Sequence, residues 1–572
     1  MNDKFNTTIL NKSKIAYFSM EIGIESSIST YAGGLGVLAG DTVKTAADLR
    51  LPFIAVTLIS NKGYFKQHIA ADGNQYELSQ EWSPAEKMEL LPITTSVIIE
   101  GREVKIKSWL YSARSVLGHE VPILFLDTNV LDNHVEDREI TSYLYGRDRN
   151  YRLKQEIVLG IGGVKILKAL NLNIEKYHMN EGHSSFLALE LLKMNDMNID
   201  KIRDLCVFTT HTPIEAGHDK FDYQMVQNNL GDYLPIDEIK KLGGNDYLNM
   251  TLLALNLSNY VNGVAKKHRE VTKNMFPGYD IHSITNGIHS YSWSAKSFRA
   301  LYDKYIPGWI REPELLFKVD LIPDGEIWKA HLDSKRELID YVNQNHQVQM
   351  DYDTFTIGFA RRATAYKRAN LIFTDLERLK RINKENKIQI IFSGKAHKMD
   401  DSGKSIIKEI MQKINNLKEE IAIVYLEDYN LNLAAKMVAG VDLWLNTPQK
   451  PLEASGTSGM KAAHNGVVNF SVLDGWWIEG WMEGITGYSI GYHPEVIVTL
   501  EESFRKEIED LYSKLEYIIL PMFYYKRYEW IKVMKNSIGK ISHYFNSHRM
   551  VNRYLIEAYL NNSKNSNYQT IK

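Results

Sequence analysis

The first sixty residues contain the feature that most restricts the fold: a strand, a glycine-rich loop, a helix and a second strand in immediate succession. The apolar run KIAYFSM (residues 14–20) is typical of a buried strand, and LPFIAVTLIS (residues 51–60) predicts the next one. Between them lie the loop TYAGGLGVLAGD and an amphipathic helix at about residues 38–49. This order is the signature of a βαβ unit with parallel strands. The chain is therefore expected to be an α/β protein.

The same alternation continues and then restarts after an interruption. Further strands are expected at residues 121–127 and 205–210, and helices near residues 154–170 and 184–194. Three prolines within residues 307–323 interrupt regular structure and predict a domain boundary. A second series of strands follows at residues 354–360, 388–394, 421–427 and 441–446. We expect two Rossmann-like, doubly wound domains facing a central cleft, at residues 1–315 and 316–500. Helices at residues 501–572 should close the second domain and cross back to the first.

Composition excludes several classes of protein. The formal net charge of −2 gives no field that favours nucleic acid or an anionic membrane. Cys206 is the only cysteine, so no intrachain disulfide can form. The N-terminus has no signal-peptide layout, and no apolar run approaches a membrane span. We expect a cytoplasmic protein without a nucleic-acid or membrane partner.

Two basic or glycine-rich segments predict phosphate binding. The loop with Gly33, Gly34 and Gly36 follows a strand and opens a helix, where backbone N–H groups can approach an anion. A tight turn would explain this loop equally well. RRATAYKR, with Arg361, Arg362, Lys367 and Arg368, directly follows another strand, and Lys395 follows the next. Cations at successive strand ends meet in one crevice, which favours a phosphate site.

A third segment predicts a cofactor site. EASGTSGMKAAHNG (residues 453–466) presents hydroxyls and backbone amides just before Lys461. A lysine beside a phosphate-binding loop can anchor pyridoxal phosphate through its amine. A helix-capping loop with an ordinary exposed lysine would explain the composition equally well.

The histidine segments HMNEGHSS and TTHTPIEAGHD carry polar groups at strand ends. His211, Glu215 and His218 do not have the HExxH spacing, and Pro213 interrupts the helix that would align them. We therefore expect no metal site, and a role in binding a polyhydroxylated ligand instead. Asn286, in ITNGIH, is expected on the same polar wall, although Asn-Gly is also a strong turn signal.

Taken together, these motifs resemble the glycogen, starch and α-glucan phosphorylase family in its short bacterial and archaeal form. The most specific segment is EASGTSGMKAAHNG followed by VLDG, and GGLG, NEGH, THT, TNGI, RRATAYKR, GKA and LEDY occur in the family's order. The resemblance covers nearly the whole chain. It implies a glycosyltransferase fold of the B type. It also implies phosphorolysis of α-1,4-glucan or maltooligosaccharide by inorganic phosphate, releasing glucose 1-phosphate with retained configuration.

The resemblance also implies roles for single residues. Lys461 would carry pyridoxal phosphate, whose phosphate acts as a proton relay beside the substrate phosphate. Arg362 and Lys367 would hold the phosphates, and His211 would line the sugar site with its carbonyl facing the anomeric centre. The other implied cofactor-binding residues are Tyr429, Thr457, Ser458 and Gly459. The other implied substrate-binding residues are Gly33, Gly34, Asn180, Asn286, Glu453, Ser455 and Gly456.

Three features set the chain apart from the animal enzymes of that family. Asn430 follows Tyr429 where they have an arginine, so one cofactor contact is expected to be lost or replaced. The chain begins almost at its first strand, so no phosphorylation or nucleotide control is expected. Trp476, Trp477 and Trp481 follow VLDG and could stack on glucan, but at least one should lie in the core. A homodimer, common in the family, is possible.

Two other functions compete with this one. A glucan synthase of the same fold would use a nucleotide-sugar donor and would not need Lys461 in its loop. A non-catalytic glucan-binding protein would keep the fold as a scaffold, and it should have lost some of Lys461, Arg362 or Lys367. Bound cofactor argues against the first, and turnover argues against the second.

Overall fold

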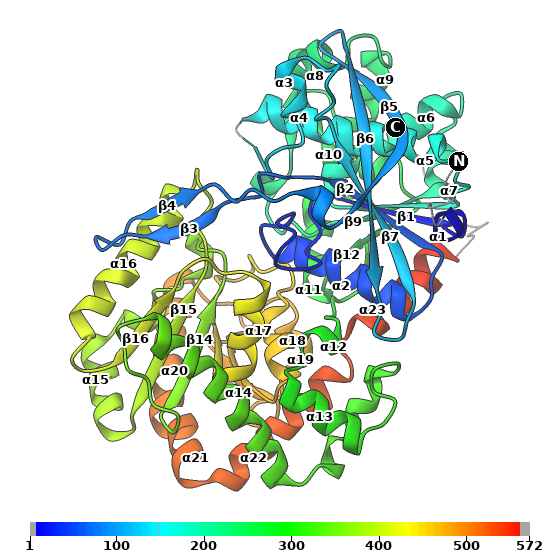
Figure 1. Cartoon of the computed structure of the whole chain (residues 1–572). Helices are drawn as coiled ribbons and strands as arrows, with labels where there is room; N and C mark the ends of the chain where they lie inside the picture. The colour runs from blue at the N-terminus through cyan, green and yellow to red at the C-terminus, as the bar shows by residue number, and fades with distance from the viewer. Residues whose placement is uncertain (1–6, 147, 561–572) are drawn as a thin grey trace.

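The computed structural model describes residues 7–146 and 148–560. Two sheets with helices on both faces form its two halves, one above the other in Figure 1. The expected fold class is confirmed, because both sheets are built mainly from parallel strands joined through helices. None of the described helices is long and apolar enough to cross a membrane.

The first sheet has nine strands, in the order β13-β12-β9-β8-β1-β2-β7-β6-β5. Its seven parallel strands contain the four that the sequence predicts in this half. The strands are β1 (Ile15–Ser19), β2 (Phe53–Leu58), β5 (Glu89–Ile99), β6 (Arg102–Arg114), β7 (Glu120–Asp127), β8 (Lys176–Asn180), β9 (Cys206–Thr209), β12 (Tyr260–Gly263) and β13 (His282–Ser283).

The second sheet has six strands, all parallel, in the order β16-β15-β14-β17-β18-β19. Read along the chain this is the 3-2-1-4-5-6 order of doubly wound dinucleotide-binding domains. The strands are β14 (Phe355–Ala360), β15 (Ile388–Ser393), β16 (Ala422–Leu426), β17 (Leu443–Asn446), β18 (Val468–Val472) and β19 (Gly487–Ile490).

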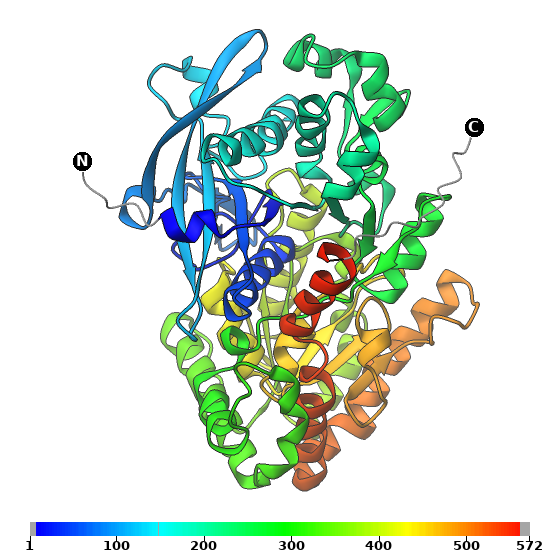
Figure 2. The same cartoon turned by 90° about the vertical axis from the view of Figure 1, so that its right-hand side faces the viewer.

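Helices cover both faces of each sheet (Figures 1 and 2). Those of the first half are α1 (Thr7–Asn11), α2 (Gly34–Asp48), α3 (Val135–Arg138), α4 (Arg149–Ile157), α5 (Gly163–Ala169), α6 (Phe186–Met194), α7 (Ile199–Leu205), α8 (Tyr223–Leu230), α9 (Ile236–Gly243), α10 (Met250–Asn256) and α11 (Lys266–Met275). Those that follow are α12 (Ser290–Trp293), α13 (Lys296–Tyr305), α14 (Asp324–Asn345), α15 (Leu376–Glu385), α16 (Asp401–Leu417), α17 (Leu431–Gly440), α18 (Ser458–Ala463), α19 (Trp477–Gly480), α20 (Leu500–Lys514), α21 (Leu520–Tyr525), α22 (Arg527–Asn536) and α23 (Ser547–Tyr554).

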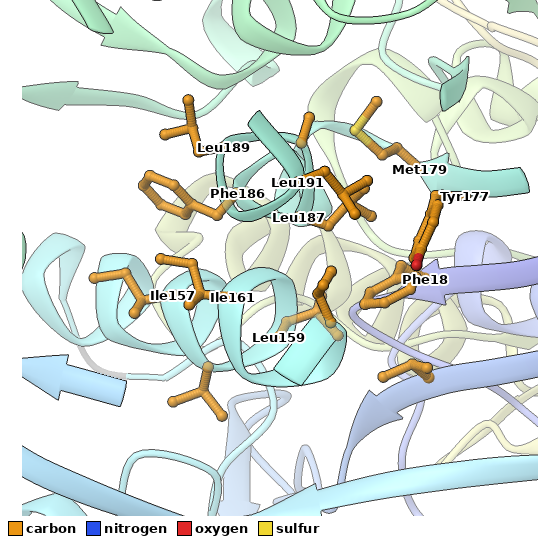
Figure 3. Close-up of a cluster of buried hydrophobic side chains, with 14 of the residues drawn as sticks. Phe18, Ile157, Leu159, Ile161, Tyr177, Met179, Phe186, Leu187, Leu189 and Leu191 are labelled. Atoms are coloured by element: carbon orange, nitrogen blue, oxygen red, sulfur yellow. The ribbon is translucent and has the colours of Figure 1, made fainter. Parts of the chain in front are cut away.

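The core of the first half is largest where α4–α6 cover the sheet. A π-helical turn, η2 (Val158–Gly162), joins α4 to α5, so the helix expected near residues 154–170 is one continuous helical segment that begins earlier, at Arg149. Its Ile157, Leu159 and Ile161 side chains pack among Phe186 and its neighbours on α6 (Figure 3). The absence of a Cβ on Gly160 allows this contact, since a Cβ there would lie 2.6 Å from a backbone atom of α6.

The last described segment, from α23 to residue 560, packs against the first half. Helix α23 contacts α2, and the hydroxyls of Ser547 and Thr45 are hydrogen-bonded. The Tyr559 hydroxyl lies 2.7 Å from Nδ1 of His178, and Tyr554 packs in the same core (red helix in Figure 2). In contrast, Tyr302, from before the three-proline segment, packs in the core of the second sheet. The domain limits at 315/316 and 500/501 remain a prediction.

Three antiparallel strand pairs were not expected from the sequence, and two of them are hairpins. Strands β5 and β6 run antiparallel and extend the first sheet through the turn Glu100–Gly101, where both residues have positive φ. A second hairpin, β3 (Lys66–Ile69) and β4 (Gln75–Leu78), leaves the first half and lies beside α16 of the second (Figure 1). A third, smaller ribbon is formed by β10 (Lys220–Asp222) and β11 (Tyr247–Asn249).

The β3–β4 hairpin is bonded to the second half through Gln67. Its Nε2 donates to the carbonyl of Gly394 at 2.8 Å, and its Oε1 accepts from the N–H of Asp428 at 2.9 Å. Its own N–H donates to the Asp428 carboxylate, and Gln75 bonds the carbonyl of Ala396. This hairpin therefore holds the two halves together beside the ends of β15 and β16.

Candidate active site

Each sheet has one point where the strand order reverses, and the loops at both points carry the polar residues singled out above. In the first sheet this point lies between β1 and β8, and in the second between β14 and β17. Ligands of open parallel sheets bind beyond the carboxyl ends of the strands at such points. The loop after β1 leads to Gly33, and β8 ends at Asn180. Strand β14 leads into RRATAYKR, and β17 into the loop with Glu453.

The backbone at Gly33 and Gly34 faces open space at the start of α2. A Cβ at either position would meet no atom within 4 Å, and no side chain caps this helix end. Behind it lies the Glu21 carboxylate, which accepts the N–H of Ala32 at 2.6 Å and that of Gly33 at 3.2 Å. Burial raises the pKa of Glu21 although these bonds lower it. An anion can therefore approach this backbone closely, where the helix dipole favours it.

His211 and Asn180 meet beside the first switch point. Nε2 of His211 lies 2.7 Å from Oδ1 of Asn180, and because that oxygen is an acceptor, Nε2 carries the proton. The Glu181 carboxylate accepts the N–H of His211 at 2.7 Å. Burial lowers the pKa of His211 to about 3, so the ring is neutral at physiological pH. The imidazole can bind a ligand hydroxyl but does not act as a cationic acid.

Glu453 lies between two cations of the second half. Its Oε2 is 2.5 Å from both the Arg361 guanidinium and the Lys367 amine. Burial alone would raise the pKa of Glu453, but the charges of Arg361 and Lys367 outweigh it and lower that pKa to about 2. Its N–H donates to the Asp474 carboxylate at 2.9 Å. Arg361, to which the sequence analysis assigned no role of its own, is thus the arginine that contacts Glu453.

The neighbouring Arg362 is exposed, and its guanidinium interacts with Tyr366. Its charge acts on Glu21 and on Tyr64 of the first half and lowers the pKa of each, against burial. The predicted phosphate-binding residues Arg362 and Gly33 therefore belong to one electrostatic neighbourhood, built from both halves.

The loop before Lys461 is tightly packed. The Ser455 hydroxyl donates to the carbonyl of Gly456 at 3.1 Å, and the Ser458 hydroxyl accepts from the Trp444 indole at 3.0 Å. A Cβ on Gly459 would lie 2.3 Å from Oδ1 of Asn469, so only glycine fits. Thr457 precedes α18 without a side-chain bond to its start.

Lys461 is buried on α18, in the second half, beside Trp293 of α12. Its Nζ lies 3.9 Å from the centroid of the Trp293 ring. Burial lowers its pKa to about 8, in part offset by the carboxylate of Asp41 and reinforced by the charge of Lys44. A lysine with this pKa is about one-tenth free amine at pH 7, against roughly one part in three thousand at the ordinary 10.5.

Asn286 presents an unused acceptor. Its side chain is buried, and its Oδ1 has no hydrogen-bond partner among the described residues. The backbone there is fixed by Arg549 of α23, whose guanidinium donates to the carbonyls of Thr285 and Asn286 at 2.7 and 3.0 Å. A buried polar atom without a partner is costly unless a ligand satisfies it.

Asn430 caps a helix at the position where the resemblance implies that a cofactor contact is lost or replaced. Its side chain accepts the N–H groups of Asn432 and Leu433 and so caps α17. Burial raises the pKa of the neighbouring Tyr429 phenol. The departure at residue 430 therefore supplies a helix cap.

The three residues considered for a metal have separate partners. Nδ1 of His218 lies 2.7 Å from the Thr251 hydroxyl, Glu215 pairs with Lys220 at 2.8 Å, and His211 contacts Asn180. Within residues 7–146 and 148–560, no three His, Cys, Asp or Glu side chains gather as metal ligands.

The tryptophans after VLDG are mostly core residues. Trp476 and Trp477 are buried and pack on one another with ring centroids 5.1 Å apart, whereas Trp481 is partly exposed. The expectation that at least one lies in the core is confirmed.

Glu21, Asp41 and Trp293 were not singled out by the sequence motifs. Glu21 was detectable as a lone carboxylate directly after a buried strand, and Asp41 as one in the apolar stretch of α2. Nothing in the local sequence links Trp293 to Lys461, because that contact joins distant segments.

Two doubly wound halves with polar loops at both switch points form the architecture of the B-type glycosyltransferases. A family model described as carbohydrate phosphorylase matches residues 214–485. The maltodextrin phosphorylase of Thermococcus litoralis is 41% identical over 95% of this chain and 70% of its own. The glycogen phosphorylase of Aquifex aeolicus is 37% identical over 96% and 86%, and that of Mycobacterium tuberculosis 33% over 95% and 70%. The chain belongs to the carbohydrate phosphorylase family.

Proposed function

We propose that the chain is an α-1,4-glucan phosphorylase. It would use inorganic phosphate to release glucose 1-phosphate from the non-reducing end of glycogen, starch or maltodextrin, with retained configuration. The observation that carries this proposal is Lys461, which is buried against Trp293 after the loop that follows β17 and has a lowered pKa. Family membership and the names of the relatives support it.

The residues present fit pyridoxal phosphate. A buried lysine that is partly free amine at neutral pH suits covalent attachment to an aldehyde. Thr457, Ser458 and Gly459, with Tyr429 and Lys367, would hold the cofactor. When bound, the cofactor supplies a phosphate that titrates near neutral pH and serves as an acid–base group.

The chain's own residues would hold and orient the substrates. Gly34 would bind the substrate phosphate through its backbone N–H group, and Gly33, whose own N–H donates to Glu21, would leave room for the anion beside it. Arg362 and Lys367 would offset the charge of two nearby phosphates. The neutral His211, its Nε2–H directed at Asn180, would line the sugar site as a hydrogen-bonding group.

Sugar hydroxyls would be bound by the remaining polar groups. The unpartnered Oδ1 of Asn286 and the ionised Glu453 are acceptors suited to hydroxyl donors. Asn180, Ser455 and Gly456 are proposed to complete this wall. The cytoplasmic location and a homodimer are further parts of the proposal.

The test is chemical trapping at Lys461. The purified chain, reconstituted with pyridoxal phosphate, is reduced with borohydride, digested and searched by mass spectrometry for a phosphopyridoxyl adduct. Unreduced protein is assayed for glucose 1-phosphate release from maltooligosaccharide and phosphate. We expect an adduct at Lys461 and phosphate-dependent release, and neither in Lys461→Ala. Lys418→Ala, at an exposed lysine, is the control.

Other outcomes separate the alternatives. No adduct, together with transfer from a nucleotide-glucose, would replace the proposal with a glucan synthase. An adduct without turnover, but with tight glucan binding, would leave a non-catalytic binding protein.

A further inference from the structure

Trp293 is held by the side chain of Asp41. The Trp293 indole N–H lies 3.0 and 2.9 Å from the two carboxylate oxygens of Asp41, on the second turn of α2. Both residues are buried, with exposed fractions of 5% and 2%. A buried carboxylate with a donor on both oxygens fixes the plane of the ring.

The backbone of Trp293 is fixed to the helix of Lys461. Nδ2 of Asn465 donates to the carbonyl of Trp293 at 2.8 Å and to that of Lys461 at 3.0 Å. Its Oδ1 accepts the N–H of Ala295 at 2.7 Å. The indole therefore cannot shift relative to Lys461 without breaking bonds at both its ends.

The ring so fixed presents its face to the Lys461 amine, 3.9 Å from the centroid. An indole face attracts an ammonium group, most strongly where water is excluded. The Asp41 carboxylate, bonded to the indole N–H, adds negative charge close enough to act on Lys461. Both effects stabilise the protonated lysine, and burial opposes them.

We propose that Asp41 is a positioning residue for Lys461: through Trp293 it fixes where the amine lies, and its charge sets how readily the amine gives up its proton. The proposal rests on the proposed function in one respect, namely that Lys461 is the cofactor lysine. Helix α2 would then have two roles: its N-terminal end, next to Gly33, would bind phosphate, and its Asp41 would position Lys461.

The charges around Lys461 agree with this assignment. Asp41 raises the pKa of Lys461 against burial, and Lys44, one turn further along α2, lowers it. Asp41 and Lys44 both lie in the first half, while Lys461 belongs to the second. The reactivity of Lys461 would therefore depend on assembly of the two halves.

The test measures the proton affinity of Lys461 in the cofactor-free full-length chain. A brief pulse of an amine-reactive anhydride at several pH values, followed by peptide mass spectrometry, gives the midpoint of Lys461 labelling. We expect Asp41→Asn, which removes the charge but keeps an acceptor for the indole, to lower this midpoint by about half a unit or more. Asp41→Ser is a second neutral variant should asparagine fail to fold, and Asp41→Glu should restore the midpoint.

Asp48→Asn is the matched control, because Asp48 is another buried carboxylate of α2 but pairs with His289 at 2.8 Å. It should leave the midpoint unchanged. Wild-type midpoints in both neutral Asp41 variants would overturn the proposal and leave Asp41 a packing residue. The borohydride adduct at Lys461 is scored separately in wild type, so a failed cofactor assignment would show there and not in the labelling midpoint.

Discussion

A single residue, Lys461, carries a cost of burial that depends on pH. The unfolded chain keeps its lysine protonated up to a pH of about 10.5, whereas the folded chain loses that proton near pH 8. Between these values the unfolded state binds more protons, so stability must rise with pH. Below pH 8 the full penalty of holding an ammonium group in the core remains.

Replacing this lysine by methionine should therefore stabilise the cofactor-free chain most at low pH. The gain expected from the pKa shift is about 3 kcal/mol at pH 7 and about 1.4 kcal/mol at pH 9.5. Urea titrations of wild type and Lys461→Met at both pH values measure it. Lys418→Met, at an exposed position, should show no such change with pH, and a gain equal at the two pH values would disprove the burial argument.

At the scale of single residues, the sequence indicated which residues are candidates for the site, but not which residues they contact. Lys461 and Glu453 were recognisable from the EASGTSGMK segment. Which of the adjacent Arg361 and Arg362 contacts Glu453 depends on the direction of each side chain after β14, which no motif encodes. The contact of Asp41 with Trp293 joins residues 252 positions apart, so local sequence could not reveal it.

Among the elements, α2 contains one glycine that we propose binds a ligand and another that the packing requires. A Cβ on Gly34 would enter open space, whereas one on Gly36 would lie 2.7 Å from the Glu21 carboxylate and 2.8 Å from Tyr31. The two glycines are two residues apart on the same helix, which makes them a matched pair.

Gly34→Ala should leave the melting temperature unchanged or slightly raised, because alanine favours a helix. It should raise KM for phosphate about tenfold or more, since the added methyl group keeps the anion from the backbone. Gly36→Ala should instead lower the melting temperature. Thermal unfolding and phosphate titrations distinguish the two effects, and an unchanged KM in Gly34→Ala would place the phosphate elsewhere.

Periodicity predicted the buried parallel strands, because both their faces are apolar. The β5–β6 hairpin was not predicted. Buried and intermediate residues alternate along much of β6, and this alternation was an available strand signal, whereas β5 is mostly exposed and shows no such regular pattern. Gly101 was a further signal, because two-residue hairpin turns need positive φ, which glycine adopts readily, and the structure has positive φ at Glu100 and Gly101. The π-helical turns follow from tertiary packing and have no local signature.

For the whole molecule, the β3–β4 hairpin is the connection that ties one half to the other beside the site. Gln67 is 1% exposed, and its amide bonds Gly394, Gln75 and Asp428. Its removal would take one hydrogen bond from each of these three groups, although Gly394 keeps the Tyr425 hydroxyl and Gln75 keeps the N–H of Ala396. Each lost hydrogen bond costs about 0.5–1.5 kcal/mol.

Gln67→Ala should therefore lower stability by about 2–4 kcal/mol, and should also weaken phosphate and glucan binding because the halves separate more easily. Gln412→Ala, at an exposed position of α16, is the control. Calorimetry measures the first effect and KM for both substrates the second. Lowered stability with unchanged KM values would make the hairpin a purely structural connection.

The return of α23 to the first half has a consequence for biosynthesis. Met550, Val551, Tyr554 and Tyr559 fill part of the core beneath α2, yet the ribosome makes them more than 500 residues after that helix begins. The first half therefore emerges with an incomplete apolar core and must wait, partly open, for the last helix of the described chain. Chains interrupted late in translation should expose this surface and depend on chaperones, whatever the stability of the finished enzyme.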